Sequence, residues 1–274
     1  MSILFEDLNL NPALVDALKK ENITVPTDIQ EKVIPNALKN LDLIAQSETG
    51  TGKTLAYLLP LYEKLNAENR EMQAIILVPT HELAIQVLRQ IERLTENSGI
   101  KLSATPIIGN VNISRQVEKL KERPHIIVGS PGRILELIKK KKISAHTIKT
   151  IIIDEADKLL DLNNLDMVKA VIKSTLKERQ LMVFSATITE KTITQAKELM
   201  KEPETIRGEA EVTVPSNIEH IYFIAEQRDK IDVVRKLIRI INPSKAILFV
   251  NNSVDIDIAA EKLKYHGLKA EGIH

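Results

Sequence analysis

Residues 41–54 of the chain read Leu41-Asp42-Leu43-Ile44-Ala45-Gln46-Ser47-Glu48-Thr49-Gly50-Thr51-Gly52-Lys53-Thr54. The apolar run Leu41–Ala45 predicts a buried strand, and the spacing of apolar residues in Thr54–Leu65 predicts a helix directly after the loop. A glycine-rich turn between a strand and a helix is typical of phosphate-binding loops, because backbone N–H groups and the positive end of the helix dipole converge there. The stretch therefore predicts an α/β fold that binds a phosphorylated ligand.

The loop has the residue types that a nucleoside triphosphate requires. Gly50 and Gly52 let the backbone approach the phosphate oxygens without a side-chain clash. Lys53 supplies a positive charge to the outer phosphates, and the Thr54 hydroxyl is a ligand for magnesium. The general phosphate-loop pattern has glycine at the position of Ser47, so the match is one residue short. The alternative is a glycine-rich turn with an incidental lysine, which the predicted strand and helix on either side disfavour.

Composition excludes several classes of function. The 274 residues include 38 Lys and Arg against 37 Asp and Glu, so a polyanion must be held by a local patch, and a histone-like polycation is excluded. The absence of cysteine excludes a disulfide scaffold, a thiolate zinc site and a cysteine nucleophile. The six histidines lack metal-cage spacing, so we expect no zinc. The basic run Lys139–Lys142 is better explained by solvation at a helix end than by an RNA patch.

The sequence also predicts the cellular compartment. Glu6 and Asp7 stand where a secretory signal would carry Lys or Arg ahead of an apolar run. No stretch approaches the ~20 apolar residues that span a bilayer. We therefore expect a cytoplasmic protein without membrane contact.

Short apolar runs alternate with segments of helical period along the chain. The predicted strands are Leu41–Ala45, Ala74–Val78, His125–Val128, Thr150–Ile153, Leu181–Phe184 and Ala246–Val250. The predicted helices between them include Thr54–Leu65, Glu82–Leu94, Arg133–Lys140 and Glu190–Met200. Continuously apolar strands that alternate with helices indicate a doubly wound parallel sheet covered on both faces.

The domain organisation follows from a break near residue 210. Pro203 and the polar residues that follow develop no apolar face, so we predict a first domain over residues 1–207 and a linker over 208–217. In residues 218–274 we expect two strands, Ile218–Ala225 and Ala246–Val250, and two helices, Lys230–Ile241 and Val254–Tyr265. This second unit is shorter than a typical domain, and we expect it to be incomplete and marginally stable alone.

The predicted strand Thr150–Ile153 runs directly into Asp154-Glu155-Ala156-Asp157. Ligands of open parallel sheets gather at the carboxyl ends of strands, so we expect Lys53 and Asp154 to converge across neighbouring strand ends on one magnesium-bound nucleotide. Asp154 would hold the magnesium through water, and Glu155 would orient or deprotonate the water that attacks the γ-phosphate. The alternative for Asp154 alone is a helix N-cap.

With these residues the chain resembles the DEAD-box ATP-dependent RNA helicases. Further motifs of that family occur in the family's order over essentially the whole chain. The matching stretches are Pro26–Gln30, Pro79–Ala84, Ser130–Arg133, Asp154–Asp157, Ser185–Thr187 and Ile247–Asn252. The resemblance implies two RecA-like domains, of which residues 218–274 would form part of the second.

The resemblance assigns roles to individual residues. The catalytic residues implied are Lys53, Asp154 and Glu155, and the magnesium ligands are Thr54 and Asp154. The ATP-binding residues implied are Phe5, Thr27, Gln30, Thr49, Gly50, Thr51, Gly52, Lys53 and Thr54. Asp157, Ser185 and Thr187 would couple the ATP state to the RNA state. Gln30 suits adenine, because its amide is both a donor and an acceptor.

The implied partner is RNA, gripped by its backbone without sequence preference. The residues implied for this contact are Pro79, Thr80, Gly109, Ser130, Gly132 and Arg133. Taken singly, Pro26–Gln30, Pro79–Ala84 and Ser130–Arg133 are ordinary helix starts, and Ser185–Thr187 carries little information.

Several positions depart from the family's pattern. Asn22-Ile23 replaces glycine and an aromatic residue, so stacking on adenine is lost. His81 replaces an arginine, which puts one RNA phosphate contact in doubt. Asn110 follows Gly109 where two glycines are usual, and Asn tolerates a positive φ.

The resemblance therefore implies an ATP-dependent RNA helicase that uses ATP and Mg²⁺. The family's later motifs, including its arginine-rich stretch, have no counterpart in these residues, so we expect the chain alone to bind ATP weakly, to hydrolyse it poorly and not to unwind RNA. One alternative is an ATP- and RNA-binding fragment without turnover. Another is a different phosphate-loop enzyme, such as a nucleotide kinase or a DNA translocase.

Overall fold

The computed structural model describes residues 3–109, 112–208 and 218–273. It divides the chain into two compact units, residues 1–211 and 212–274. Of the predicted linker 208–217, only Gly208 lies among the described residues. Each unit is described by itself below.

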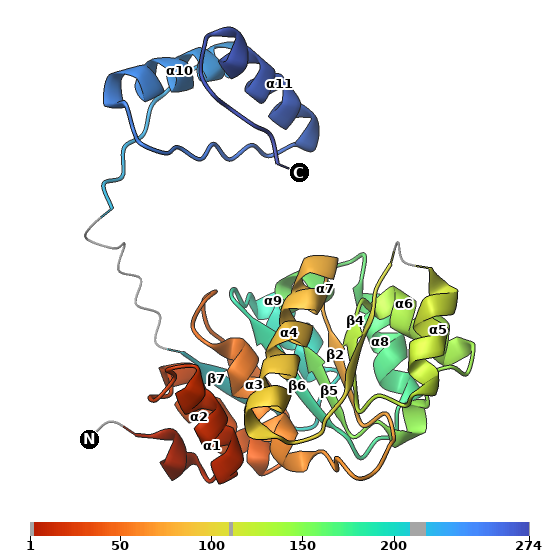
Figure 1. The fold of residues 1–274 in the computed structure, drawn as a ribbon. Coiled ribbons are helices and arrows are strands. Elements are labelled where there is room, and N and C mark those ends of the chain that lie inside the picture. The colour runs from red at the N-terminus through yellow and green to blue at the C-terminus, as the bar shows by residue number, and fades with distance from the viewer. Residues whose placement is uncertain (1–2, 110–111, 209–217, 274) are drawn as a thin grey trace. The chain divides into compact units, whose positions relative to one another are not determined.

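The first unit is built on one seven-stranded sheet in which every pairing is parallel (Figure 1). Its strands are β1 Leu43–Gln46, β2 Ala74–Leu77, β3 Ala104–Ile107, β4 Ile126–Gly129, β5 Thr150–Ile153, β6 Gln180–Ser185 and β7 Glu204–Arg207. Their order across the sheet is β3-β4-β2-β5-β6-β1-β7. The expected α/β fold with a doubly wound parallel sheet is confirmed.

Helices cover both faces of this sheet (Figure 1). They are α1 Pro12–Lys20, α2 Asp28–Leu38, α3 Lys53–Lys64, α4 His81–Ser98, α5 Ile113–Lys121, α6 Pro131–Lys139, α7 Ala156–Leu159, α8 Leu165–Ser174 and α9 Glu190–Lys197, with short 3₁₀ helices at Phe5–Leu8 and Ala145–Thr147. Side chains alternate across the sheet, so that Leu43 and Ala45 join the core with α1 to α4 while Ile44 joins the core with α6 and α8. Burial on both faces explains why the central strands are continuously apolar.

Two strands of the first unit were missed from the sequence. β3 contains Pro106, and its burial alternates between half-buried and buried positions. β7 exposes three of its four residues and lies at the edge of the sheet, where we predicted the end of the domain. Edge strands need no continuous apolar run, so the pattern used for the central strands does not detect them.

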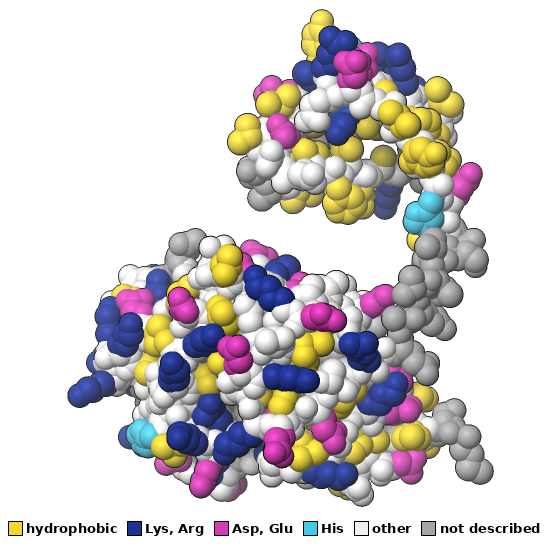
Figure 2. Space-filling model, turned by 180° about the vertical axis from the view of Figure 1, so that it is seen from behind, with side chains coloured by type: hydrophobic (Ala, Val, Ile, Leu, Met, Phe, Trp, Pro, Cys, Tyr) yellow, Lys and Arg dark blue, Asp and Glu magenta, His cyan; other side chains and the backbone are white. Residues whose placement is uncertain are grey.

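The second unit contains α10 Lys230–Ile241 and α11 Ser253–Tyr265, which contact each other, and the 3₁₀ helix Gln227–Asp229. Both predicted helices are confirmed, but the predicted strands Ile218–Ala225 and Ala246–Val250 are wrong, because the described residues of this unit form no strand. A strand requires a partner for its backbone groups, and neither segment has one here. Apolar side chains such as Tyr222, Ile224 and Phe249 are therefore exposed, and Figure 2 shows hydrophobic groups on this unit's surface.

The part of the chain that the structure describes contains no helix that is both long and apolar enough to cross a membrane. Figure 2 shows Lys, Arg, Asp and Glu side chains intermixed on one face of the first unit, in keeping with the balanced composition.

β3 packs tightly against β4 at Gly129. A Cβ atom built on Gly129 would lie 1.8 Å from the Ile107 carbonyl oxygen, so only glycine fits at this strand end. This contact brings Gly109 and Ser130, the residues that follow the two strands, to the same edge of the sheet.

We predict that Gly129→Ala lowers the free energy of unfolding by about 1–3 kcal/mol, because the added methyl group forces β3 away from β4. Urea unfolding of the full chain measures the change. Gly109→Ala is the control, since a Cβ there meets nothing within 4 Å and φ is not positive. Equal stability of the two variants would contradict the prediction.

Candidate active site

The carboxyl ends of the parallel strands bring most of the predicted motifs of the first unit to one edge of the sheet. The phosphate loop follows β1, the stretch Asp154–Asp157 follows β5 and the stretch Ser185–Thr187 ends β6, whereas Phe5, Thr27 and Gln30 precede β1 in the chain. The residues expected to bind RNA follow β2, β3 and β4. One expectation needs correction: β1 and β5, which precede Lys53 and Asp154, are not neighbouring strands, because β6 lies between them. The half of the edge formed after β1, β5 and β6 meets the half formed after β2, β3 and β4 where β5 pairs with β2.

The loop after β1 depends on its two glycines. Gly50 and Gly52 have φ of 84° and 90°, a region that side chains with a Cβ rarely adopt. A Cβ on Gly52 would lie 2.4 Å from the Gln30 amide nitrogen. Ser47, at the position where the general pattern has glycine, donates from its hydroxyl to the Thr51 hydroxyl over 2.6 Å. The hydroxyl of Thr51 donates to the Glu48 carbonyl, so the substituted position ties the loop together.

Lys53 begins α3 and lies half-buried at the loop. Its ammonium donates to the carbonyl oxygens of Ser47 and Glu48 over 2.5 and 2.6 Å. Burial lowers the pKa of Lys53, and the nearby carboxylates, foremost that of Asp154, oppose this. The structure therefore holds a partly desolvated cation where the phosphate groups are expected.

Thr27 and Gln30 contact the same loop from the start of α2. The Thr27 hydroxyl donates to the Thr51 carbonyl over 2.7 Å, and the Gln30 amide donates to the Gly52 carbonyl over 3.1 Å. The Gln30 carbonyl accepts from the Thr27 N–H in a capping box, and Gln30 is only 1% exposed.

The other two residues predicted to bind ATP differ in exposure. Phe5 is buried in the core with α1 to α4. Thr49 is exposed at the tip of the loop.

The two residues that depart from the family's pattern before Pro26 have structural roles. Asn22 adopts a left-handed conformation with φ of 59°, which glycine and asparagine tolerate best. Ile23 packs partly buried against the core formed with α1 to α4.

Asp154 follows β5 and is 4% exposed. Its Oδ2 accepts from the Tyr57 hydroxyl over 2.9 Å, and its Oδ1 accepts from the Glu155 N–H over 2.9 Å. Burial raises the pKa of Asp154, while these hydrogen bonds and Lys53 oppose the shift. Sequence reasoning missed Tyr57, because a single tyrosine on the apolar face of a predicted helix gives no signal of a polar contact. Burial raises the pKa of Tyr57 well above its usual range.

Glu155 has φ of 52°, an uncommon value for a residue other than glycine. Its carboxylate pairs with Lys158 over 2.8 Å, one turn along α7. Lys158 was also missed, since a lysine three residues after a glutamate is an ordinary feature of helices.

Asp157, Ser185 and Thr187 form a hydrogen-bonded group between the ends of β5 and β6. The Ser185 hydroxyl donates to Asp157 Oδ1 over 2.6 Å and also contacts the Thr187 carbonyl at 2.8 Å. The Thr187 hydroxyl donates to Asp157 Oδ2 over 3.3 Å. The structure thus brings together the three residues predicted to act in coupling.

The residues predicted to contact RNA lie at the ends of β2, β3 and β4. Thr80 caps α4 by accepting from the Leu83 N–H over 3.2 Å, and Pro79 precedes it half-buried. Ser130 precedes Pro131, the first residue of α6, and Gly109 is exposed after β3.

Two further residues predicted to contact RNA lie on α6 itself. The Arg133 guanidinium pairs with Glu136 over 3.2 Å on the same helix. Gly132 packs against α8, where its added Cβ would meet the Met167 sulfur at 3.1 Å.

The donor set fits magnesium better than a metal caged by protein ligands. One buried carboxylate, Asp154, and the hydroxyl of Thr54 leave most coordination positions to water and phosphate, as Mg²⁺ prefers. Burial raises the pKa of Tyr57, and Thr54 lies close enough to oppose that rise, which places its hydroxyl beside the phenol that contacts Asp154. Among the described residues no three His, Asp or Glu side chains form a metal-binding group.

Comparison with known proteins gives the same identification. Residues 27–196 match the family model described as DEAD/DEAH box helicase. The chain is 43% identical over 97% of its length to the DEAD-box ATP-dependent RNA helicase CshC of Bacillus cereus, and 38% identical over its full length to CshA of Bacillus subtilis. It spans 67% and 55% of the lengths of these two relatives.

Two solved structures extend the likeness. Saccharomyces cerevisiae Dbp5 bound to RNA and ADP BeF3 matches 96% of the chain and 67% of its own chain with a TM-score of 0.80 at 31% identity. A DEAD box protein from Methanococcus jannaschii matches 100% of the chain and 74% of its own with a TM-score of 0.70 at 32% identity. Since the family model covers more than half of the residues and the relatives match nearly all of them, the chain belongs to the DEAD-box helicase family.

Proposed function

We propose that the chain is the ATP-binding part of an ATP-dependent RNA helicase, which uses ATP binding and hydrolysis to unwind or remodel RNA. The observation that carries the proposal is the arrangement at the carboxyl edge of the sheet, where a phosphate loop, a buried aspartate and the Asp157–Ser185 link lie on strands that pack side by side. The names of the relatives, which describe ATP-dependent RNA helicases, support the same reading.

In the proposed ATP site, the loop from Thr49 to Thr54 binds the phosphates. Its backbone N–H groups and the start of α3 favour an anion, and the Lys53 ammonium would exchange its two carbonyl partners for phosphate oxygens. Gln30 and Thr27 hold the loop by hydrogen bonds to its carbonyl oxygens, and their proposed contact with adenine would add to that role. Phe5 would act indirectly, through the core that supports α2.

Thr54 and Asp154 would hold Mg²⁺, partly through water. Bound there, the ion would neutralise charge on the phosphate oxygens. Tyr57 fixes one oxygen of Asp154, and the Glu155 N–H fixes the other. Glu155 is proposed to position or deprotonate the attacking water, for which its carboxylate would have to leave Lys158.

RNA is proposed to bind across the ends of β2, β3 and β4. Thr80, Ser130 and Gly109 present hydroxyls and backbone N–H groups at two helix starts and one turn, which suits phosphate contacts that do not read sequence. Pro79, Gly132 and Arg133 complete this surface. The Dbp5 structure named above contains RNA and supports the proposal by its likeness to this chain.

The group Asp157, Ser185 and Thr187 is proposed to couple the two sites. It joins the end of β5, which borders the RNA half of the edge through β2, to the end of β6, which borders the phosphate loop through β1. A shift of the loop on nucleotide binding would therefore reach Asp157 through a polar contact that is partly shielded from water.

A second candidate function is ATP and RNA binding without turnover by these 274 residues. The segments 218–225 and 246–250 form no strand, so the described residues of the second unit present no sheet edge to a nucleotide. Another phosphate-loop activity, such as a nucleotide kinase, is disfavoured by the family assignment.

We predict that Lys53→Ala weakens ATP binding about 10–100-fold, because the variant loses a charge-assisted hydrogen bond to the phosphates. Isothermal titration calorimetry with Mg²⁺ and ATP measures the change. Lys39→Ala is the control, since Lys39 is exposed at the opposite edge of the sheet, before β1. Unchanged ATP affinity in Lys53→Ala would remove the phosphate loop from the proposal.

We predict that residues 1–274 alone hydrolyse ATP slowly and do not separate a short RNA duplex, because these residues contain no counterpart of the family's arginine-rich stretch to neutralise the transferred phosphoryl group. Phosphate release and strand separation would be measured with and without RNA, beside the Bacillus cereus relative as positive control. RNA-stimulated unwinding by the chain itself would contradict this prediction.

A further inference from the structure

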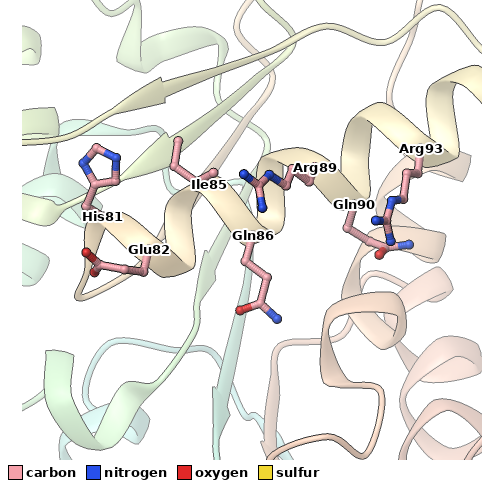
Figure 3. A pocket seen from close by; sticks show the side chains of 7 residues that line it. All are labelled: His81, Glu82, Ile85, Gln86, Arg89, Gln90 and Arg93. Atoms are coloured by element: carbon pink, nitrogen blue, oxygen red, sulfur yellow. The ribbon is translucent and has the colours of Figure 1, made fainter. Parts of the chain in front are cut away.

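The exposed face of α4 has a hollow of about 510 Å³, and beyond His81 and Glu82 at its start the side chains that line it belong to none of the motifs above. Figure 3 shows the side chains that line it, and all of them come from this one helix. They are His81, Glu82, Ile85, Gln86, Arg89, Gln90 and Arg93. The hollow is therefore an open groove that runs along α4. The helix begins at His81, directly after Pro79 and Thr80.

The basic residues of this groove fall on one ridge of the helix. His81, Arg89 and Arg93 share the i, i+4 row that also contains Ile85, so successive members are about 6 Å apart and the row extends about 18 Å from its start. Gln86 and Gln90 form the neighbouring row after Glu82. We call His81, Arg89 and Arg93, with Gln86 and Gln90, the α4 ridge.

The α4 ridge carries donors that nothing else in the described chain uses. Arg89 and Arg93 are exposed, and neither has a carboxylate within 4.0 Å or a hydrogen-bond partner among the described residues. Of the acids on the same helix, Glu82 lines the hollow near its start, beside His81, whereas Glu92 and Glu96 are exposed but do not line it. Arginines left unpaired beside a hollow are suited to a ligand that brings its own negative charge.

The composition of the groove decides between a nucleic acid and a protein as that ligand. Protein-docking surfaces have an apolar or aromatic centre, and Ile85 is the one apolar side chain that lines this hollow. Arginine and glutamine side chains are typical donors to phosphate and sugar oxygens. The groove is also continuous with the helix start at Thr80, where the RNA backbone is proposed to bind.

We propose that the α4 ridge binds the phosphate backbone of the RNA strand where it continues beyond the site at Pro79 and Thr80. This inference rests on the proposed function, and it adds a second contact region that lengthens the RNA footprint down the side of the first unit. The ridge contributes affinity without sequence preference, because its donors reach phosphates and not base edges.

The test uses the full chain with Arg89→Gln and Arg93→Gln together. The matched control is Arg70→Gln with Lys177→Gln, which removes two exposed positive charges at the opposite edge of the sheet, before β2 and β6. Fluorescence anisotropy would measure binding of single-stranded RNA of about 6 and about 15 nucleotides, over a range of salt concentrations.

We expect the ridge variant to bind the longer RNA about 10-fold more weakly, with a salt dependence shallower by about 1.4 in the log–log slope for two lost phosphate contacts. Binding of the shorter RNA and of ATP stays at the level of the control variant. Three outcomes would overturn the ridge while the proposed function stands: equal binding of the longer RNA by both variants, an equal loss on both RNA lengths, or a loss of binding to an acidic peptide without a loss on RNA. Failure of the unmodified chain to bind either RNA would overturn the proposed function and the ridge with it.

Discussion

The common direction of all seven strands is the constraint on which the rest of the first unit depends. A parallel sheet places every carboxyl strand end at one edge, and the helix N-termini that follow lie at that edge too. Segments as distant as residues 47–54, 79–81, 130–133, 154–157 and 185–187 therefore reach one surface. The strand order then divides this surface, with the phosphate loop beside β6 and the proposed RNA contacts on the far side of β5.

The phosphate loop satisfies its own polar groups. Lys53 donates to two loop carbonyls, and the Thr51 hydroxyl donates to one of them, that of Glu48. Gln30 and Thr27 hold the loop from the start of α2. A triphosphate would have to replace the carbonyl partners of Lys53, so the net gain is the difference between two sets of hydrogen bonds. This exchange, together with Ile23 packed in the core in place of an aromatic residue, is a physical reason to expect weak ATP binding. Burial also raises the pKa of Asp154, because its negative charge is costly in a buried position until a cation is bound beside it.

The sequence predicted the parts that have strong local signals. Thr150–Ile153 is a strand at the predicted residues, and the loop between β1 and α3 has the predicted strand, glycine turn and helix. Asp157, Ser185 and Thr187 come together as expected. The prediction that β1 and β5 are neighbouring strands was wrong, because the order of strands in a sheet depends on long-range packing and not on local pattern. Tyr57 and Lys158 were missed because their polar contacts arise only when α3 meets β5 and when α7 forms. The strands expected in the second unit failed for a related reason, since an apolar run forms a strand only where another strand pairs with it.

Amide hydrogen exchange of the full chain, with and without saturating MgATP, tests the central claim most directly. The account predicts that the nucleotide slows exchange of the backbone amides of residues 49–54 and 154–157, that omission of Mg²⁺ reduces the effect at 154–157, and that α10 and α11 do not change. Unchanged exchange at residues 49–54 in the presence of bound ATP would contradict it, because the nucleotide would then occupy another part of the molecule.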